Sequence, residues 1–493
     1  MSESTLGSLT ALEPRPVWEQ FDAIRRIPRP SRREERIAEH VRSWAAGHAF
    51  AVRADAAGNL VVVVPASAGR EDAETVVLQA HLDMVCEKNA GVDHDFDRDP
   101  IAVAVDGDWV RARGTTLGAD NGIGVAAAMA AAVDPEVEHG PLELLFTLDE
   151  ETGLNGALAF DPAIVEGRLL LNLDTEEDDA IYIGCAGAGG VLIELDVERA
   201  AAPVAGTELC ELFVSGLRGG HSGVDIHENR GNAIKIAVRV LLEAVERGID
   251  FDLVILDGGS KANAIPREGF AQLSLTPAAR AAFEALLTEL RRELEADFGT
   301  VDPELRVALR EPPEACEWPP LAAADRDRLL RLLSAAPHGV IAMSREVPGL
   351  VETSNNVAVV RTDEDLAGIE LAFRSSVNAA LASTGQALRS LARLSGGEVT
   401  TTRGYPGWKP EPDSPLVKRT AAVYERLFGA EPGVEAIHAG IECGLLVEKV
   451  PGLAAVSIGP EIRDPHSPSE RVRISSVAKF YRFLQALLVT LSA

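Results

Sequence analysis

The sequence is poor in cysteine and in positive charge, and each shortage excludes a class of protein. Its five cysteines among 493 residues are scattered, odd in number and free of CxxC spacing. We therefore expect no disulfides and a reducing, cytoplasmic location. The 47 basic residues against 76 acidic ones leave a net charge of −29. This charge argues against nucleic acid or an anionic membrane surface as a partner.

Long apolar runs and a signal peptide are also missing. The longest apolar stretch, residues 122–133, is short and rich in alanine, so we expect no transmembrane segment. The N-terminal sequence MSESTLGSLTALEPRP lacks the basic-then-apolar order of a secretory signal. The composition is typical of a soluble globular protein, and the length predicts two or three domains.

Short β-branched runs alternate with helical patterns in the first third of the chain. Residues 59–64, 75–80, 142–148 and 169–173 resemble buried strands, and residues 122–133 a helix of small side chains. This alternation predicts an α/β fold, with a mostly parallel sheet flanked by helices.

The pattern changes after Asp174, where alternating strands and a helix at residues 232–248 predict a smaller α+β domain. We expect this domain at residues 187–398, inserted into a first domain made of residues 1–186 and 399–493. The Pro/Gly-rich stretch RGYPGWKPEPDSP is the expected return point between them.

Acidic and histidine residues follow several of the predicted strands or open the next helix. They are His81, Asp83, Asp120, Glu150, Glu151, Asp174 and, after the last strand, His466. Open α/β sheets collect ligands at the carboxyl ends of their strands, so these side chains should converge. Two imidazoles and three carboxylates would suit a dinuclear site for ions such as zinc. Any one of them alone is more often a cap or turn residue, but a buried Glu150–Glu151 doublet is costly without cations.

Several motifs together resemble the aminoacyl-histidine dipeptidases, also called Xaa-His dipeptidases or peptidase D. These belong to the aminoacylase/carboxypeptidase group of di-zinc metallopeptidases. The motifs are HLDMVCEKN, GTTLGADNGIGVA, DEETGLNGA, NLDTEE, GGHSGVDIHENRGNAIK, ANAIPRE, ETSNNVA, YPGWKPEPDSPL and HAGIECG. The resemblance runs from about Val17 to the C-terminus. It implies a di-metal peptidase domain interrupted by a smaller α+β lid domain.

The resemblance also implies a role for each residue of the predicted site. His81 and Asp174 would bind one metal, Glu151 and His466 the other, and Asp120 would bridge the two. Glu150 would be the general base, Asp83 would orient His81, and the Asp120–Asn121 peptide bond would be cis. The cofactor would be two divalent ions, with zinc favoured and manganese or cobalt as alternatives.

Further residues of the middle domain resemble substrate-binding groups of this family. His221 corresponds to a lid histidine that polarises the scissile carbonyl, within its own subunit or across a homodimer. Asn263 and Arg374 would hold the C-terminal carboxylate of the substrate, which a bidentate arginine suits. Gly440 would present its backbone to the substrate. A β-turn around His221 and Gly440 and a surface position for Arg374 are the structural alternatives.

The expected function is metal-dependent hydrolysis of dipeptides, chiefly Xaa-His (carnosine-like) ones with broader dipeptides also accepted, by a metal-activated water with Glu150 as base. A small peptide would be the substrate, with no nucleic acid or membrane as partner. A tripeptidase or an N-acyl-amino-acid amidohydrolase of the same group is the nearer alternative. A non-catalytic metal- or peptide-binding protein is the alternative from another class. The glycine-rich segments do not follow a nucleotide-binding spacing.

Overall fold

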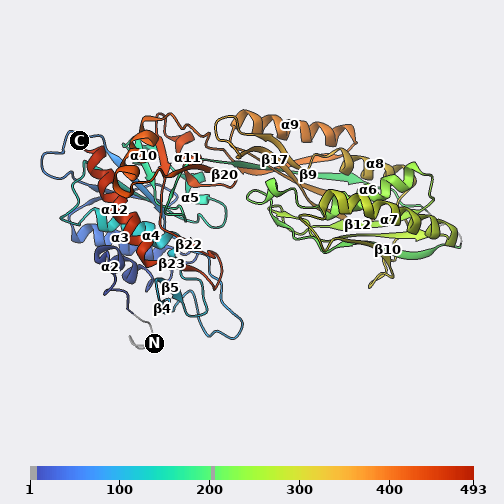
Figure 1. Cartoon of the computed structure of the whole chain (residues 1–493), viewed down its shortest axis with the longest axis horizontal. Helices are drawn as coiled ribbons and strands as arrows, with labels where there is room; N and C mark the ends of the chain where they lie inside the picture. The colour runs from blue at the N-terminus through green and yellow to red at the C-terminus, as the bar shows by residue number, and fades with distance from the viewer. Residues whose placement is uncertain (1–7, 201–205) are drawn as a thin grey trace. The chain divides into compact units, whose positions relative to one another are not determined.

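The computed structural model describes residues 8–200 and 206–493, which form two compact units (Figure 1). The first unit contains the chain up to Cys185, residues 408–436 and residues 441–493. The second contains residues 186–407 and 437–440. The boundary expected after residue 398 falls at the start of strand β19 (Glu398–Tyr405), which pairs with β9 (Gly187–Asp196) inside the second unit.

The first unit combines a large sheet, a small sheet and several helices. Its helices are α2 (Arg15–Ile24), α3 (Glu35–Gly47), α4 (Ala119–Ala131), α5 (Asn155–Ala159), α10 (Pro415–Phe428), α11 (Glu442–Lys449) and α12 (Ile474–Leu491), with a 3-10 turn at Pro162–Ile164. Its strands are β1 (Ala51–Ala54), β2 (Leu60–Val64), β3 (Val76–His81), β4 (Val103–Asp106), β5 (Trp109–Ala112), β6 (Leu142–Thr147), β7 (Leu169–Asn172), β8 (Ala180–Cys185), β20 (Gly433–Ile437), β21 (Ala454–Ser457), β22 (Ile462–Arg463) and β23 (Arg471–Arg473).

The large sheet has the strand order β1-β2-β6-β3-β7-β21-β8-β20. Its four central strands, β6, β3, β7 and β21, are parallel, and β1, β2 and β8 pair antiparallel on either side. The predicted parallel sheet is thus confirmed at its centre. These central strands are buried along most of their length, as continuous apolar strands in parallel sheets are.

Two helices complete the core of the first unit. The small side chains of α4 are almost all buried, which lets this helix pack closely against α2 and β3. Helix α12 is long and apolar enough to cross a membrane by length and composition alone, which we did not expect from the sequence. Half of it is buried, and its Phe480, Leu484 and Leu488 belong to the core of this unit, so packing explains its composition.

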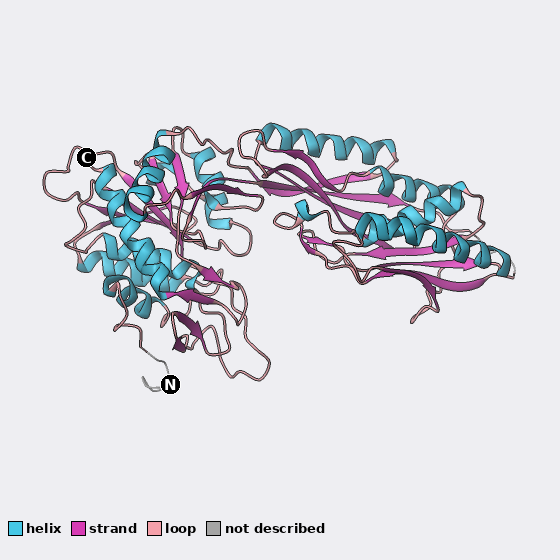
Figure 2. Cartoon of the chain, in the orientation of Figure 1, coloured by secondary structure: helices cyan, strands magenta, loops and turns pink. Residues whose placement is uncertain are grey.

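The second unit is an antiparallel sheet with helices packed against it (Figure 2). Its strand order is β15-β10-β14-β12-β17-β18-β9-β19, with β16 also paired to β17, and β11 pairs separately with β13. The remaining elements are β10 (Glu208–Ser215), β11 (Gly220–His221), a 3-10 turn (Ile226–Glu228), α6 (Ala233–Glu246), β12 (Asp252–Gly258), β13 (Ala264–Ile265), β14 (Gly269–Leu275), α7 (Pro277–Phe298), β15 (Arg306–Arg310), α8 (Ala323–Ala335), β16 (Gly339–Met343), β17 (Val351–Thr362), β18 (Leu366–Ser375) and α9 (Asn378–Leu394).

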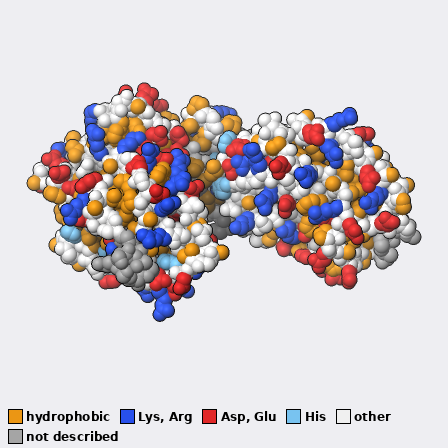
Figure 3. All heavy atoms as spheres, turned by 60° about the horizontal axis from the view of Figure 1, so that its bottom comes forward, with side chains coloured by type: hydrophobic (Ala, Val, Ile, Leu, Met, Phe, Trp, Pro, Cys, Tyr) orange, Lys and Arg blue, Asp and Glu red, His pale blue; other side chains and the backbone are white. Residues whose placement is uncertain are grey.

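The surface charge is mixed on the face that Figure 3 displays. Acidic and basic side chains are interspersed over both units there, with no single acidic patch. The acidic excess of the sequence therefore includes many ordinary solvated side chains on this face.

Candidate functional site

Strand topology explains why residues far apart in the sequence meet in the first unit. His81 ends β3, Glu150 and Glu151 follow β6, and Asp174 follows β7. These three strands are parallel neighbours, so their carboxyl ends lie at the same edge of the sheet. His466 reaches this edge from the segment after β22.

Asp120 lies at the centre of this group. Its Oδ1 is 2.9 Å from Nε2 of His81, and its Oδ2 is 3.0 Å from Nε2 of His466. His81 Nε2 is also 3.4 Å from Asp174, and His466 Nε2 is 3.0 Å from Glu151. The carboxylate of Asp120 thus lies between two sets of possible metal ligands, His81 with Asp174 and His466 with Glu151. The Asp120–Asn121 peptide bond is cis, as predicted.

The donor atoms of each set are close enough to share an ion. In both, Asp120 together with its two partners has ligand atoms within 4.8 Å of one another, and so do His81, Glu150 and Glu151. Oε1 of Glu151 is buried and has no hydrogen-bond partner in the structure. Imidazole nitrogens and carboxylate oxygens are the ligands that zinc binds at catalytic sites. The residues present therefore fit a pair of divalent cations.

Burial and crowding shift the pKa values of these groups. Burial raises the pKa of Glu150 well above its usual value, and the carboxylates of Glu151 and Asp174 raise it further. Burial also raises the pKa of Asp174 to about 6, although His81 opposes this shift. Burial disfavours the charged form of His81, but the carboxylates of Asp174 and Asp120 raise its pKa well above 6.5. Such an excess of buried carboxylates favours cations at this place.

Asp83 is fully buried behind His81. Its Oδ1 lies 3.3 Å from Nδ1 of His81. It also accepts hydrogen bonds from the hydroxyl of Ser31 at 2.8 Å and from the backbone N–H groups of Glu150 and Glu151 at 3.0 and 3.1 Å. Despite its burial, its pKa is lowered to about 2 by His81 and these donors. Asp83 therefore connects the β3 segment to the glutamate doublet.

Two buried charged residues that the sequence did not indicate hold the backbone around Asp120. Arg29 donates to the carbonyl oxygens of Leu82, Asp83 and Gly118. Glu470 accepts four backbone N–H groups from residues 117–120. No sequence pattern predicts these contacts, because both side chains bind backbone atoms of segments that are distant in the sequence. Proximity to His466 is the only signal that could have found Glu470.

A third unpredicted residue, Glu442, lies in a buried polar network beneath the site. Its Oε2 accepts hydrogen bonds from Gln79 at 2.6 Å and from Thr147 at 2.7 Å, while its Oε1 is buried without a partner. Burial raises the pKa of Glu442 to about 7. Glu442 belongs to the HAGIECG motif, in which the resemblance implies a role for Gly440 and none for Glu442.

The predicted substrate-binding residues lie in the second unit. The pairing of β11 with β13 aligns His221 with Ala264, next to Asn263, and the carbonyl of Asn263 accepts a hydrogen bond from the backbone N–H of Ser222. Nδ1 of His221 accepts the backbone N–H groups of Gly223 at 3.2 Å and Val224 at 3.0 Å. The proton of the neutral ring is therefore on Nε2.

Arg374 and Gly440 lie near His221 in this unit. A Cβ atom on Gly223 would come within 3.0 Å of His221 Cε1 and 3.1 Å of Arg374 Nε, so these groups face one another there. Arg374 donates to the hydroxyl of Tyr405 at 3.3 Å. A Cβ atom on Gly440 would come within 2.5 Å of the same hydroxyl, which explains the glycine. Burial and the charge of Arg374 lower the pKa of His221 to about 4, so His221 is neutral at pH 7.

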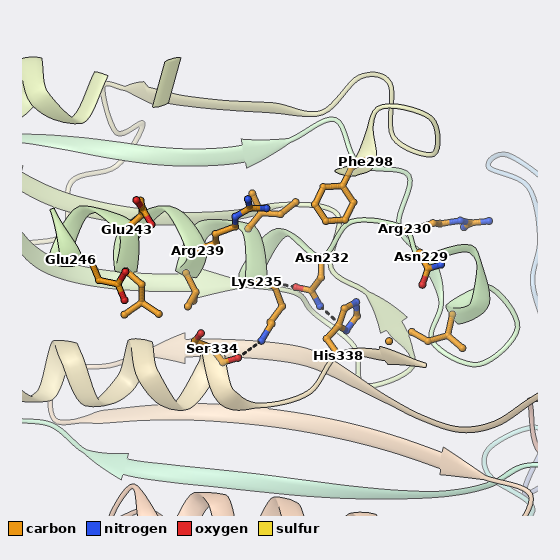
Figure 4. Close-up of a pocket in the computed structure, with 15 residues that line it drawn as sticks. Asn229, Arg230, Asn232, Lys235, Arg239, Glu243, Glu246, Phe298, Ser334 and His338 are labelled. Carbon is orange, nitrogen blue, oxygen red and sulfur yellow. Dashed lines mark hydrogen bonds between the residues drawn. The ribbon is translucent and has the colours of Figure 1, made fainter. Parts of the chain in front are cut away.

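A separate cavity of about 540 Å³ lies in the second unit between α6 and the end of α8 (Figure 4). Three positively charged side chains line it, and each already has hydrogen-bond or ion-pair partners. Lys235 donates to the carbonyls of residues 333, 334 and 336, Arg239 pairs with Glu293 and Asp297, and Arg230 pairs with Asp225 and Glu228. None of the predicted site residues lines this cavity. Lys235 therefore caps the C-terminal end of α8, and Arg239 and Arg230 form ion pairs, so these contacts account for the positive charges of the cavity.

Comparison with known proteins identifies the family. The sequence model of peptidase family M20/M25/M40 matches residues 77–490. The chain is 42% identical over 488 residues to the cytosol non-specific dipeptidase of Escherichia coli (strain K12), covering 99% of this chain and 100% of that protein. The crystal structure of aminoacylhistidine dipeptidase from Vibrio alginolyticus is similar with a TM-score of 0.91 at 41% identity, over 99% of each chain. An aminopeptidase of Bacillus cereus shares the fold, with a TM-score of 0.56 at 15% identity over 98% of this chain and 100% of that one.

Proposed function

This chain belongs to peptidase family M20/M25/M40, and we propose that it is a metal-dependent dipeptidase that acts in the cytoplasm. The observation that carries the proposal is the position of Asp120, whose two carboxylate oxygens face His81 and His466 at 2.9 and 3.0 Å. One carboxylate facing two sets of possible ligands is an arrangement that can hold a pair of ions close together. The name of the Escherichia coli relative supports the cytoplasmic location.

We assign the metal ligands from this geometry. His81 and Asp174 would hold one ion, His466 and Glu151 the other, and Asp120 would bridge both. Ions held there would polarise the scissile carbonyl and supply a nucleophilic water near neutral pH. Zinc is the favoured ion because the set mixes imidazole and carboxylate, and manganese or cobalt are the alternatives.

Glu150 is the proposed general base. Its carboxyl group lies beside His81 and Glu151, and burial together with neighbouring carboxylates raises its pKa. A raised pKa makes the carboxylate a better proton acceptor, as general-base catalysis needs. Glu150 would take a proton from the attacking water and pass it to the amine nitrogen that leaves. Asp83 would hold the ring of His81 in its ligating orientation through Nδ1.

The polar groups of the second unit are proposed to bind the substrate. His221 is neutral with its proton on Nε2, so it can donate a hydrogen bond to a carbonyl oxygen. Arg374 and Asn263 would bind the C-terminal carboxylate, which favours a charge-assisted bond to the guanidinium. Gly440 would offer backbone to the substrate. A requirement for a free carboxylate would restrict the enzyme to short peptides.

The two relatives suggest the substrate range. One is called a non-specific dipeptidase and the other an aminoacylhistidine dipeptidase. We propose that this enzyme accepts many dipeptides, Xaa-His dipeptides among them.

A dipeptide panel tests the proposal. The panel should include Xaa-His and other dipeptides, their C-terminal amides, a tetrapeptide and an N-acyl amino acid. Each is assayed after chelation and after zinc, manganese or cobalt is added back. We expect free dipeptides to be hydrolysed fastest and chelation to abolish the activity until metal returns. Hydrolysis that persists in chelator would contradict the metal assignment. Faster hydrolysis of the acyl amino acid would contradict the dipeptidase assignment.

A further inference from the structure

We propose that Glu470 is a positioning residue of the metal centre, because its buried carboxylate fixes the backbone segment that carries Asp120 relative to the segment that carries His466. The inference rests on the proposed function, since it assigns a role toward the same pair of ions. It concerns a residue that touches neither ion nor substrate.

The contacts of Glu470 are all to backbone at one place. Its Oε2 accepts the N–H groups of Leu117 at 2.6 Å and Gly118 at 2.9 Å. Its Oε1 accepts those of Ala119 at 2.7 Å and Asp120 at 3.3 Å. Four consecutive donors therefore share one carboxylate, and the side chain is 1% exposed. Such an arrangement leaves the 117–120 backbone little freedom to move relative to Glu470.

The local backbone needs this support. Helix α4 is assigned from Ala119, but Asp120 (φ −77°, ψ 112°) and Asn121 (φ −105°, ψ 32°) are not helical, and Gly118 before them is left-handed with φ of 70° and offers no side-chain cap. The first N–H groups of a helix have no partner within the helix and attract negative charge. Glu470 satisfies them from 350 residues further along the chain. The same carboxylate is only four residues after His466, so it connects the two ligand-bearing segments directly.

Arg29 also holds the segment that precedes Asp120, through backbone carbonyl oxygens. It donates to the carbonyls of Leu82 and Asp83 at 2.9 and 2.6 Å and to that of Gly118. A Cβ atom on Gly118 would lie 2.6 Å from its guanidinium, so the residue must be glycine. Arg29 thus links the 82–83 segment to the 117–120 segment, and Glu470 links the latter to the His466 segment. As the proposed shared ligand, Asp120 would have to reach both ions at once, and displacement by about 1 Å can cost about 10²-fold in activity.

Glu470→Gln is the direct test. The amide keeps one acceptor oxygen but turns an NH₂ group toward N–H donors, so part of the support is lost while the size of the side chain is kept. We expect a roughly 10–100-fold weaker affinity for at least one of the two ions and a similar fall in kcat, as for other residues behind metal ligands. KM should change little. The cobalt-substituted variant should also show an altered visible absorption spectrum.

Glu143→Gln is the matched control. Glu143 is also a buried glutamate of the first unit that accepts backbone N–H groups, from Glu166 and Gly167, but it lies on β6 away from the ligands. This variant should lose thermal stability yet keep both ion affinities and the cobalt spectrum. Equal loss of ion affinity in the two variants would reduce the role of Glu470 to general stability and overturn the proposal. Unchanged ion affinity in Glu470→Gln would overturn it as well.

Hydrogen exchange provides a measurement that does not need the variant to fold. Leu117 and Gly118 precede α4, so the contact with Glu470 is what protects their amides. In the metal-free wild-type protein we expect slow exchange in peptides that contain residues 117–120. Rapid exchange there would overturn the proposal. If the wild-type protein bound no divalent ion in titration calorimetry, the proposed function would fail first, and the two failures are thereby separated.

Discussion

His81 and His466 of the first unit and three histidines of the second unit lie in opposite electrostatic surroundings. In the first unit, carboxylates surround the imidazoles, and hydrogen bonds to Asp120 and Glu151 raise the pKa of His466 to about 11. The pKa of His81 is also raised by the carboxylates of Asp174 and Asp120, against the effect of burial. Histidines among carboxylates form a site that attracts cations.

In the second unit, His221, His338 and His438 lie near cationic side chains. Burial lowers the pKa of His338 to about 4, and the charge of Lys235 lowers it further. Burial and the charge of Arg374 lower the pKa of His438 to about 3 and that of His221 to about 4. Neutral imidazoles beside a guanidinium suit a carbonyl and a carboxylate. The same residue type therefore has a raised pKa among carboxylates in one unit and a lowered pKa near cationic side chains in the other, which suits the different roles proposed for His81 and His221.

The largest effect should come from the glutamate doublet of the first unit. Glu150→Gln removes a proton acceptor, so we expect kcat to fall by about 10³-fold or more while both ions remain bound. Glu151→Gln removes a proposed ligand and should lower the metal content itself. Metal analysis and kcat of the two purified variants check this. Equal metal loss in both would contradict the division of roles within the doublet.

A substitution at the proposed substrate-binding site of the second unit should weaken catalysis on the substrate and leave metal binding unchanged. Arg374→Ala should lower kcat/KM on free dipeptides by roughly 10²-fold, because a buried charge-assisted contact is worth about 2–5 kcal/mol. C-terminally amidated dipeptides should be affected much less, and the metal content should be unchanged. Arg331→Ala, an exposed arginine on α8, is the control. A similar loss on free and amidated dipeptides would remove Arg374 from the carboxylate site.

Much of the first unit could be predicted from the sequence because its information is local. The strands β3, β6 and β7 are short apolar runs, and each is followed by a polar residue of the candidate site. The rule that parallel strands present their carboxyl ends together then brings His81, Glu151 and Asp174 to one edge. The α/β fold expected from this alternation is confirmed.

Other features depend on contacts between distant segments and could not be predicted. The small sheet β22-β23-β5-β4 joins strands of a few residues from both ends of the chain. Glu470 and Arg29 bind backbone atoms. Every residue type supplies the same backbone groups, so the sequence does not show which segment they contact. Strand β19 is polar, EVTTTRGY, and only its pairing with β9 puts it in the second unit, beyond the boundary expected at residue 398.

A smaller effect should follow from Asp83→Asn in the first unit. The amide keeps the shape but loses an acceptor for the N–H groups of Glu150 and Glu151 or for His81. We expect metal affinity to fall by roughly 10–100-fold. Asp302→Asn is the matched control, because this buried aspartate accepts backbone N–H groups of Arg218 and Gly231 in the second unit. Unchanged metal affinity in Asp83→Asn would contradict its orienting role.

The smallest effect should be a loss of stability in acid that arises in the second unit. The pKa of His338 is about 4 in the folded protein, against about 6.5 in an unfolded chain. As the pH falls below 6.5, the unfolded chain binds the proton first, so stability present above pH 6.5 is lost progressively toward pH 4. For His338 the loss at pH 5 is at most about 2 kcal/mol. The neutral ring is favoured by burial and by the nearby charge of Lys235, and its Nδ1 faces the amide nitrogen of Asn232 at 3.3 Å.

His338→Gln tests this origin, because glutamine can keep a polar contact but cannot bind the proton. Urea unfolding at pH 5 and pH 7.5, with chelator in every sample so that metal binding in the first unit does not contribute, should show a smaller pH dependence in the variant. His227→Gln changes an exposed histidine of the same unit and should leave the pH dependence as in the wild type. If His338→Gln keeps the full pH dependence, the loss arises elsewhere, and the contrast between the histidines of the two units does not extend to stability.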